Sequence, residues 1–279
     1  MAFPMFPVLS PLISETKTFV YKTVGDIPIQ IDTFIPTKES LKGGPVPVML
    51  FLHGGAWIGG DRTEYCRPLF HEFLAAGFVV NSADYRLLPE TPFLGGQLED
   101  VKDVERWLRK TLPLKIESYN LDVDVENIVV VGSSAGALLA LLTPSLWAKS
   151  PTAILSIYGP TNLHHLPYMP KGPFAQMELP ECTSDMLISA TNYANPPTGT
   201  TPPNSKEDFL DSRRVMGMTM FRNAVTAEFL LRGLVNFAEK GEPLILSLPE
   251  KGTVGKDEIN KISKPSYNLK FCADSVSTA

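Results

Sequence analysis

Cysteine and histidine are both scarce in this sequence. Its 279 residues include three cysteines, Cys66, Cys182 and Cys272, and four histidines. Three widely separated cysteines are too few for a disulfide framework or a zinc site. We therefore expect no metal and no cofactor, and reduced thiols fit an intracellular protein.

Long apolar runs are also lacking. No stretch approaches the roughly 20 apolar residues that a membrane span requires. The first 15 residues are apolar but contain three prolines, and no basic residue precedes Lys17. A signal peptide has a positively charged start and an uninterrupted apolar run. We therefore expect a cytoplasmic protein without a membrane span.

The chain has no excess of positive charge. Its formal net charge is −5, with 20% charged residues. A nucleic-acid surface neutralises phosphates with lysine and arginine, so a nucleic-acid partner is excluded. The hydrophobic content of 44% is enough for a core, and the length suits one large α/β domain. We predict a single domain over residues 1–279.

Short apolar runs alternate with amphipathic segments over a predicted core at about 16–159. Continuous apolar runs are typical of strands buried on both faces of a mostly parallel sheet. Their alternation with helices predicts a doubly wound α/β fold. The predicted strands are two in 16–36, then 45–52, 77–82, 128–131 and 153–158, and the predicted helices are 64–76, 97–110 and 135–147.

The pattern changes after Gly159. Residues 160–206 are rich in proline, 207–239 are predicted to be helical, and 244–248 are the best case for a late strand. We interpret about 160–260 as a lid or cap insertion and 261–279 as an irregular tail.

Ser134 lies in Gly132-Ser133-Ser134-Ala135-Gly136, between the predicted strand at 128–131 and the helix at 135–147. A Gly-x-Ser-x-Gly motif alone is weak, but a nucleophile elbow demands this strand–turn–helix context. Glycines flank such a serine because its backbone is strained and closely surrounded. The alternative is a turn that merely caps a helix.

A second glycine-rich segment, His53-Gly54-Gly55-Ala56-Trp57, follows the strand at 45–52. Glycines there let backbone N–H groups approach a substrate oxygen. His53 precedes the serine and lies inside this loop. We interpret it as a structural histidine that fixes the loop through a side-chain hydrogen bond.

Together with Asp84-Tyr85-Arg86-Leu87-Leu88-Pro89-Glu90, these segments resemble the hormone-sensitive-lipase-like branch of the α/β-hydrolases. The match in order and spacing covers roughly residues 45–160. The proline-rich second half resembles fungal members, some of which serve secondary-metabolite or toxin pathways.

The resemblance implies an α/β-hydrolase fold that acts on carboxylic esters or lactones of small molecules. Ser134 would be the nucleophile, and the backbone N–H groups of Gly55, Ala56 and Ala135, with Gly54 in the same loop, would form the oxyanion hole. Asp84 and Arg86 would hold sheet and loop together. This chain departs from the pattern at two positions, with Ala56 for a third glycine and Ser133 for an acid.

The acid and the base of a triad are missing from their usual places. In this fold the order is serine, acid, histidine. Only His164 and His165 follow Ser134, and they come early, while Asp257 is the acid candidate after 244–248. The last two strands also have no counterpart, as in a C-terminally truncated member. The apolar sheet edge left open would be covered in a homo- or hetero-oligomer.

Three functions follow from this pattern. The first is a serine carboxylester hydrolase. The second is a catalytically impaired homologue that binds small molecules, and the third is a truncated remnant.

Overall fold

The computed structural model describes residues 13–161, 163, 178–200, 210–237 and 242–263. Its strands are β1 (Ile13–Val24), β2 (Ile27–Pro36), β3 (Val46–Leu52), β4 (Val79–Ala83), β5 (Val123–Ser133), β6 (Ala153–Ile157), β7 (Val235–Asn236) and β8 (Leu246–Ser247). Its main helices are α1 (Arg67–Ala75), α2 (Leu98–Lys110), α3 (Leu112–Lys115), α4 (Ala135–Leu146), α5 (Ser184–Ser189), α7 (Ser212–Arg222), α8 (Thr226–Arg232) and α9 (Lys256–Ser263).

The first six strands form one sheet in the order β1-β2-β4-β3-β5-β6. The pairs β3–β4, β3–β5 and β5–β6 are parallel, whereas the β1–β2 hairpin and the β2–β4 pair are antiparallel. The prediction of a mostly parallel sheet is therefore confirmed. The carboxyl ends of β3, β5 and β6 lie together at one edge, which is where ligands bind in such sheets.

Strand β3 is apolar throughout because both of its faces are buried. Val48, Leu50 and Leu52 belong to the larger core cluster, which also contains residues of α2 and α4. Met49 and Phe51 belong to a smaller cluster with residues of α1 on the other face. Successive side chains of a strand point to opposite faces, so a strand covered on both faces must be apolar at every position.

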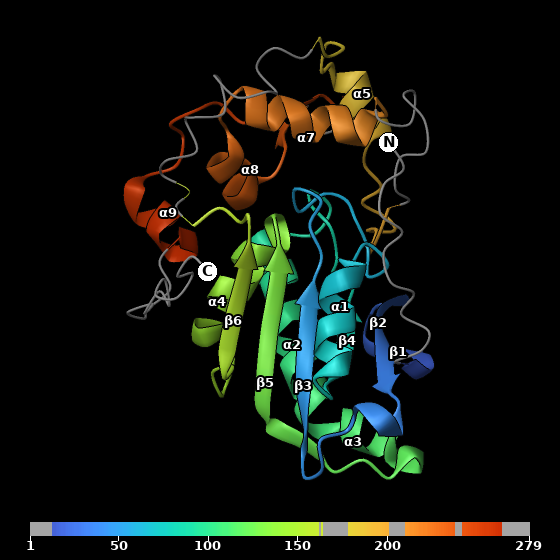
Figure 1. Cartoon of the computed structure of the whole chain (residues 1–279). Coiled ribbons are helices and arrows are strands. Elements are labelled where there is room, and N and C mark those ends of the chain that lie inside the picture. The colour runs from blue at the N-terminus through green and yellow to red at the C-terminus, as the bar shows by residue number, and fades with distance from the viewer. Residues whose placement is uncertain (1–12, 162, 164–177, 201–209, 238–241, 264–279) are drawn as a thin grey trace, which may run out of the picture.

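Helices α5, α7 and α8, which we name the cap helices, lie beyond the carboxyl ends of the parallel strands, with α8 nearest to β5 and β6 (Figure 1). The prediction of helix over 207–239 is confirmed in part by α7 and α8, but β7 follows them. The late strand expected at 244–248 is only the two-residue β8, paired with β7 outside the main sheet. A strand is therefore present within 244–248, but it does not extend the main sheet. In the described ranges, no helix is long and apolar enough to span a bilayer.

The two edges of the sheet differ in chemistry. The β1 edge carries charged residues, including the Lys17–Glu15 ion pair. The β6 edge instead exposes Leu155 by 42% and the neighbouring Tyr158 by 79%. Charged residues discourage strand addition, and apolar ones do not. Among the described strands β6 has no outer neighbour, and a covering chain there stays a prediction.

Candidate functional site

Ser134 lies at the turn between β5 and α4, with φ 50° and ψ −116°. Its backbone N–H donates to the carbonyl of Ile157 on β6 at 2.9 Å, and its own carbonyl accepts from the N–H of Ala137 at 3.1 Å. A positive φ is costly for a residue with a side chain. The surrounding backbone therefore holds this conformation in place.

The glycines of this serine turn (residues 132–136) are required by close backbone contacts. A Cβ atom on Gly132 would lie 2.1 Å from the carbonyl oxygen of Gly136. One on Gly136 would lie 2.2 Å from the carbonyl oxygen of Leu52 on β3. Neither separation is sterically possible, so both positions must be glycine. The strand–turn–helix geometry expected for an elbow is present.

The glycine loop (residues 53–60) follows β3 and lines the pocket described below. Gly55, Ala56 and Trp57 have φ values of 104°, 54° and 63°, so two residues with side chains adopt the left-handed conformation. The loop closes through bonds from the N–H groups of Ile58 and Gly59 to the carbonyl of Gly55, at 3.0 and 2.9 Å. Ala56 thus follows the backbone path of a glycine, at an expected cost of about 1 kcal/mol or more.

The glycine loop lies directly against the serine turn. A Cβ atom on Gly54 would come within 3.3 Å of the Cβ of Ser134. Within the described part of the chain, no acceptor is bonded to the N–H groups of Gly55 and Ala56. Ala135 begins α4, and the first N–H groups of a helix have no partner inside it. These donors and the positive end of the helix suit an oxyanion.

Three hydrogen bonds from other segments hold the left-handed part of the glycine loop. The carbonyl of Trp57 accepts from the N–H of Leu88 at 2.9 Å and from Nε2 of Gln97 at 2.8 Å. The carbonyl of Ile58 accepts from Nε of Arg213 on α7 at 2.5 Å. The loop conformation therefore depends on residues far away in the sequence.

His53 is fully buried and its ring stacks on Tyr85, with 4.2 Å between ring centroids. Its Nδ1 is 2.7 Å from the carbonyl oxygen of Gly54 and donates to it. Burial lowers the pKa of His53 to about 4, so the ring is neutral near pH 7. The interpretation as a structural histidine is confirmed.

Asp84 and Arg86 both take part in buried ion pairs. Asp84 accepts from Nη1 of Arg62 at 2.8 Å, and Arg62 also pairs with Asp32 on β2. Arg86 pairs with the fully buried Asp100 of α2 at 2.7 Å. The prediction that Asp84 and Arg86 hold sheet and loop together is confirmed.

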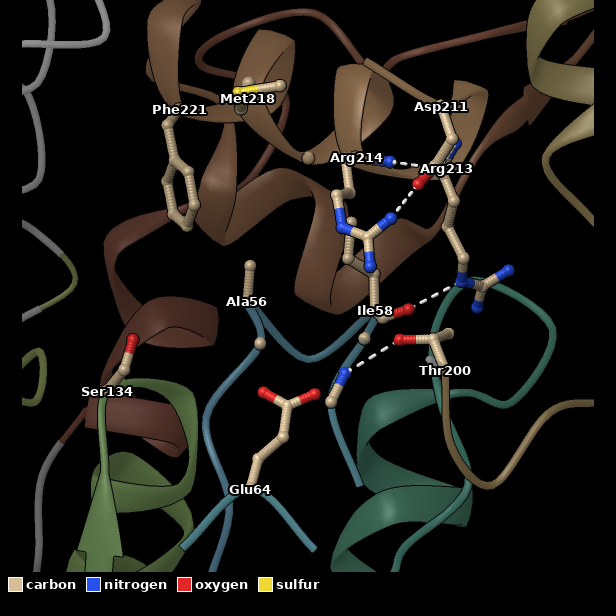
Figure 2. A pocket seen from close by; sticks show the side chains of 14 residues that line it. Ala56, Ile58, Glu64, Ser134, Thr200, Asp211, Arg213, Arg214, Met218 and Phe221 are labelled. Atoms are coloured by element: carbon tan, nitrogen blue, oxygen red, sulfur yellow. Dashed lines mark hydrogen bonds and ion pairs between the residues drawn. The ribbon is translucent and has the colours of Figure 1, made fainter. Parts of the chain in front are cut away.

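A pocket of about 590 Å³ lies between the glycine loop and helix α7, which both line it (Figure 2). Ser134 and Ala56 line it from the core side, and Met218 and Phe221 line it from the cap side. The remaining lining residues are Gly55, Ile58, Gly59, Gly60, Glu64, Thr200, Asp211, Arg213, Arg214 and Gly217. Its walls are mainly apolar, with a few polar groups, as in typical small-molecule sites.

Arg213 connects the cap helices to the core. Its guanidinium donates to both carboxylate oxygens of Glu90 at 2.8 Å, and the Glu90 side chain is fully buried. It also donates to the carbonyls of Ile58, Leu88 and Ala190. One side chain thus joins α7 to the glycine loop, to the segment after β4 and to the end of α5.

The sequence analysis did not identify Glu64, Gln97, Thr200, Arg213 or Arg214 as site residues. A charged Arg213-Arg214 pair at the start of an otherwise apolar, methionine-rich helix was a usable signal. No sequence pattern near Gln97 or Thr200 indicated that these residues contact the glycine loop. These contacts join residues 40 and 140 positions apart.

The candidate acid and bases do not complete the site. Asp257 lies in the first turn of α9, and β8 before it is not part of the main sheet. His164 and His165 lie outside the described residues. Where the structure describes the chain, no histidine is hydrogen-bonded to Ser134, and no cluster of three or more His, Cys, Asp or Glu could hold a metal.

Residues 31–198 match the sequence profile of the BD-FAE family, which is more than half of the chain. The curated relatives are fungal enzymes. Non-reducing polyketide synthase atr1 of Stereocaulon alpinum is 37% identical over 151 residues, covering 52% of this chain and 6% of the synthase. Non-reducing polyketide synthase ausA of Emericella nidulans is 30% identical over 254 residues, covering 85% of this chain and 10% of the synthase. The chain spans a tenth or less of the length of these two relatives.

A solved α/β-hydrolase superfamily protein from Enterococcus faecalis has a similar fold. The TM-score is 0.53 with 20% identity, and the match covers 77% of this chain and 68% of that one. This agreement concerns the fold alone. With the family match, the serine turn and the parallel sheet, the chain belongs to the BD-FAE family and has the α/β-hydrolase fold.

Proposed function

We propose that this chain is a serine hydrolase that cleaves carboxylic esters or lactones of small molecules. The observation that carries the proposal is the pocket, which is lined by Ser134 and by Gly55 and Ala56, whose N–H groups have no acceptor among the described residues. A nucleophile and oxyanion donors at one end of an apolar cavity are the minimum that acyl transfer requires.

In the proposed reaction, Ser134 Oγ attacks the ester carbonyl carbon and gives up its proton to a base. The negative oxygen of the tetrahedral intermediate accepts hydrogen bonds from Gly55, Ala56 and Ala135, with Gly54 packed beneath them. The ester C–O bond breaks, the alcohol leaves with a proton, and water then releases the acid from Ser134. A lactone would open to a hydroxy acid in the same way.

The polyketide synthases named above support a role in secondary metabolism. Their similarity to this chain suggests that its ester or lactone substrate derives from a polyketide. The pocket of about 590 Å³ suits a ligand of small or medium size.

A fluorophosphonate probe tests the proposal because it reacts covalently with an activated serine. We expect stoichiometric labelling at Ser134, located by peptide mass spectrometry. Labelling should be lost in Ser134→Ala and retained in Ser133→Ala, where the adjacent serine is changed instead. Absence of labelling in the unaltered chain would contradict a hydrolase.

A second candidate function is small-molecule binding without turnover. It is favoured by the absence, among the described residues, of a hydrogen bond from Ser134 Oγ to a histidine. An unactivated serine loses several orders of magnitude in rate. Saturable binding of an ester by a chain that the probe does not label would support this function, and aggregation without binding would support a remnant.

A further inference from the structure

The pocket contains two arginines, and at first sight it resembles a site for an anionic ligand. Four ionisable side chains line it, namely Glu64, Asp211, Arg213 and Arg214. Which ligand the pocket accepts depends on which of these charges are already neutralised within the protein.

Both arginines are engaged. Arg213 bonds Glu90 through two nitrogens and also three backbone carbonyls, so its donors are directed away from any ligand. Arg214 pairs with Asp211, whose carboxylate also accepts from the first N–H groups of α7. A carboxylate or phosphate on a ligand would have to compete with Glu90 for Arg213 or with Asp211 for Arg214.

Glu64 is the charge that remains. Within the described part of the chain, its carboxylate has no hydrogen bond and no ion pair, and Figure 2 shows it directed into the pocket between Ser134 and Thr200. Glu64 is exposed, so water can cover its carboxylate in the empty pocket. Partial desolvation, and then the nearby Asp61, raise its pKa.

A ligand that covers Glu64 therefore has to replace the water on this carboxylate. An apolar group would leave a desolvated charge without a partner, which is strongly unfavourable. A cationic group would face Arg214, which is close enough to lower the pKa of Glu64 through its charge. A neutral hydroxyl group donates one hydrogen bond and meets neither penalty.

The opposite wall of the pocket is apolar. Met218 and Phe221 of α7 line it, and the two other methionines of the helix, Met216 and Met220, are fully buried. Methionine adapts to irregular apolar shapes, so this wall can accommodate a carbon skeleton of varied form. The pocket thus combines an apolar region on α7 with the carboxylate of Glu64, which has no partner among the described residues.

We propose that the pocket binds acyl groups that carry a neutral hydroxyl group, which donates a hydrogen bond to the carboxylate of Glu64. This inference rests on the proposed function, since it takes the same pocket as the ligand site. It makes Glu64 a specificity-determining residue rather than a catalytic one.

The test measures equilibrium binding by calorimetry on Ser134→Ala, so that no turnover occurs. Four ligands of matched length are compared: methyl hexanoate and its omega-hydroxy, omega-amino and omega-carboxy derivatives. We expect the hydroxy ester to bind tightest, by on the order of tenfold over methyl hexanoate. Adding Glu64→Ala should abolish that preference, Glu64→Gln should keep part of it, and Glu72→Ala, at an exposed position on α1, should not change it.

Equal binding of the hydroxy ester and methyl hexanoate would overturn the inference. Tightest binding of the carboxy derivative would show that an arginine is available, and tightest binding of the amino derivative would show a cation site. Either result contradicts the inference. If the hydroxyl preference is found but the fluorophosphonate probe does not label Ser134, the hydrolase proposal fails and the ligand assignment stands. If the probe labels Ser134 but no hydroxyl preference is found, the ligand assignment fails and the hydrolase proposal stands.

Discussion

The serine turn and the glycine loop both hold residues with side chains at positive φ, yet they are stabilised in different ways. At Ser134 the backbone is enclosed by glycines that touch neighbouring backbone atoms. In the glycine loop, the carbonyl of Trp57 accepts hydrogen bonds from Leu88 and Gln97, and the carbonyl of Ile58 accepts one from Arg213. Close packing and backbone hydrogen bonds fix the first, whereas the second also depends on the side chains of Gln97 and Arg213 from distant segments.

Because of this difference, we expect the serine turn and the glycine loop to lose their structure under different conditions. Close packing responds to added volume and not to pH or to the loss of a single polar partner. A hydrogen-bonded loop responds to loss of its donors and to protonation of its own groups. We therefore expect single substitutions and low pH to affect the serine turn and the glycine loop to different extents.

Gly136→Ala should have the largest effect. The new methyl group would lie 2.2 Å from the carbonyl oxygen of Leu52 and 2.3 Å from that of His53. We expect a loss of more than about 4 kcal/mol in the free energy of unfolding, or failure to fold. Urea denaturation measures it. Gly95→Ala, where a Cβ would meet nothing within 4 Å, is the matched control and should change stability little.

Arg213→Met should come next. It leaves the fully buried Glu90 carboxylate without its cation and frees the carbonyl of Ile58. Removing one partner of a buried ion pair costs about 3 to 5 kcal/mol. Hydrogen exchange should rise in residues 55–59 and stay unchanged in 132–136.

The control for Arg213→Met is Arg232→Met, because Arg232 forms a largely exposed pair with Glu258 on the cap side. It should cost less than about 1 kcal/mol and leave residues 55–59 protected. Adding Glu90→Gln to Arg213→Met should restore part of the lost stability. An equal rise in hydrogen exchange in residues 55–59 and 132–136 of Arg213→Met would contradict the claim that the serine turn and the glycine loop are stabilised in different ways.

Acid should weaken the glycine loop by a smaller amount. The pKa of His53 is lowered from 6.5 to about 4, so below about pH 6.5 the unfolded chain binds a proton that the folded chain does not. Above that pH His53 is neutral in both states and does not change the free energy of unfolding. As the pH falls toward 4, protonation of His53 in the unfolded chain lowers the free energy of unfolding. His53 alone should contribute a loss of about 2 to 3 kcal/mol between about pH 7 and about pH 4, opposed by Asp84, whose pKa is raised by burial to about 6.

Chemical denaturation across this pH range, compared with His53→Asn, isolates the effect. The variant starts less stable but should lack most of the acid dependence. His71→Asn, which changes the partly exposed histidine of α1, should keep the slope of the unaltered chain. An unchanged slope in His53→Asn would show that another group is responsible.

The same contrast explains what could be predicted from the sequence. Gly132 and Gly136 flank Ser134 within five residues, so the serine turn and its strand and helix could be recognised locally. The structural role of His53 could also be predicted, because its bond to Gly54 spans one peptide unit.

The partners of the glycine loop could not be predicted in this way. Arg213 lies 155 positions from Ile58, and its role depends on how α7 packs over the sheet. The late strand at 244–248 is present only as the two-residue β8, and its pairing with β7 could not be predicted because an apolar run of that length specifies burial and not its partner strand. The acid and base stay predictions, since His164 and His165 lie outside the described residues.

The bonds of Arg213 also bear on how a ligand enters. Its guanidinium ties four segments together, so α7 cannot swing away without exposing the Glu90 carboxylate and several carbonyl groups at once. Cap and sheet should therefore melt as one cooperative unit, giving a single calorimetric transition. In a hydrolase whose cover is hinged, access is controlled by the rate of opening. Because Arg213 holds α7 in place through these bonds, we expect a ligand to enter this pocket without movement of α7.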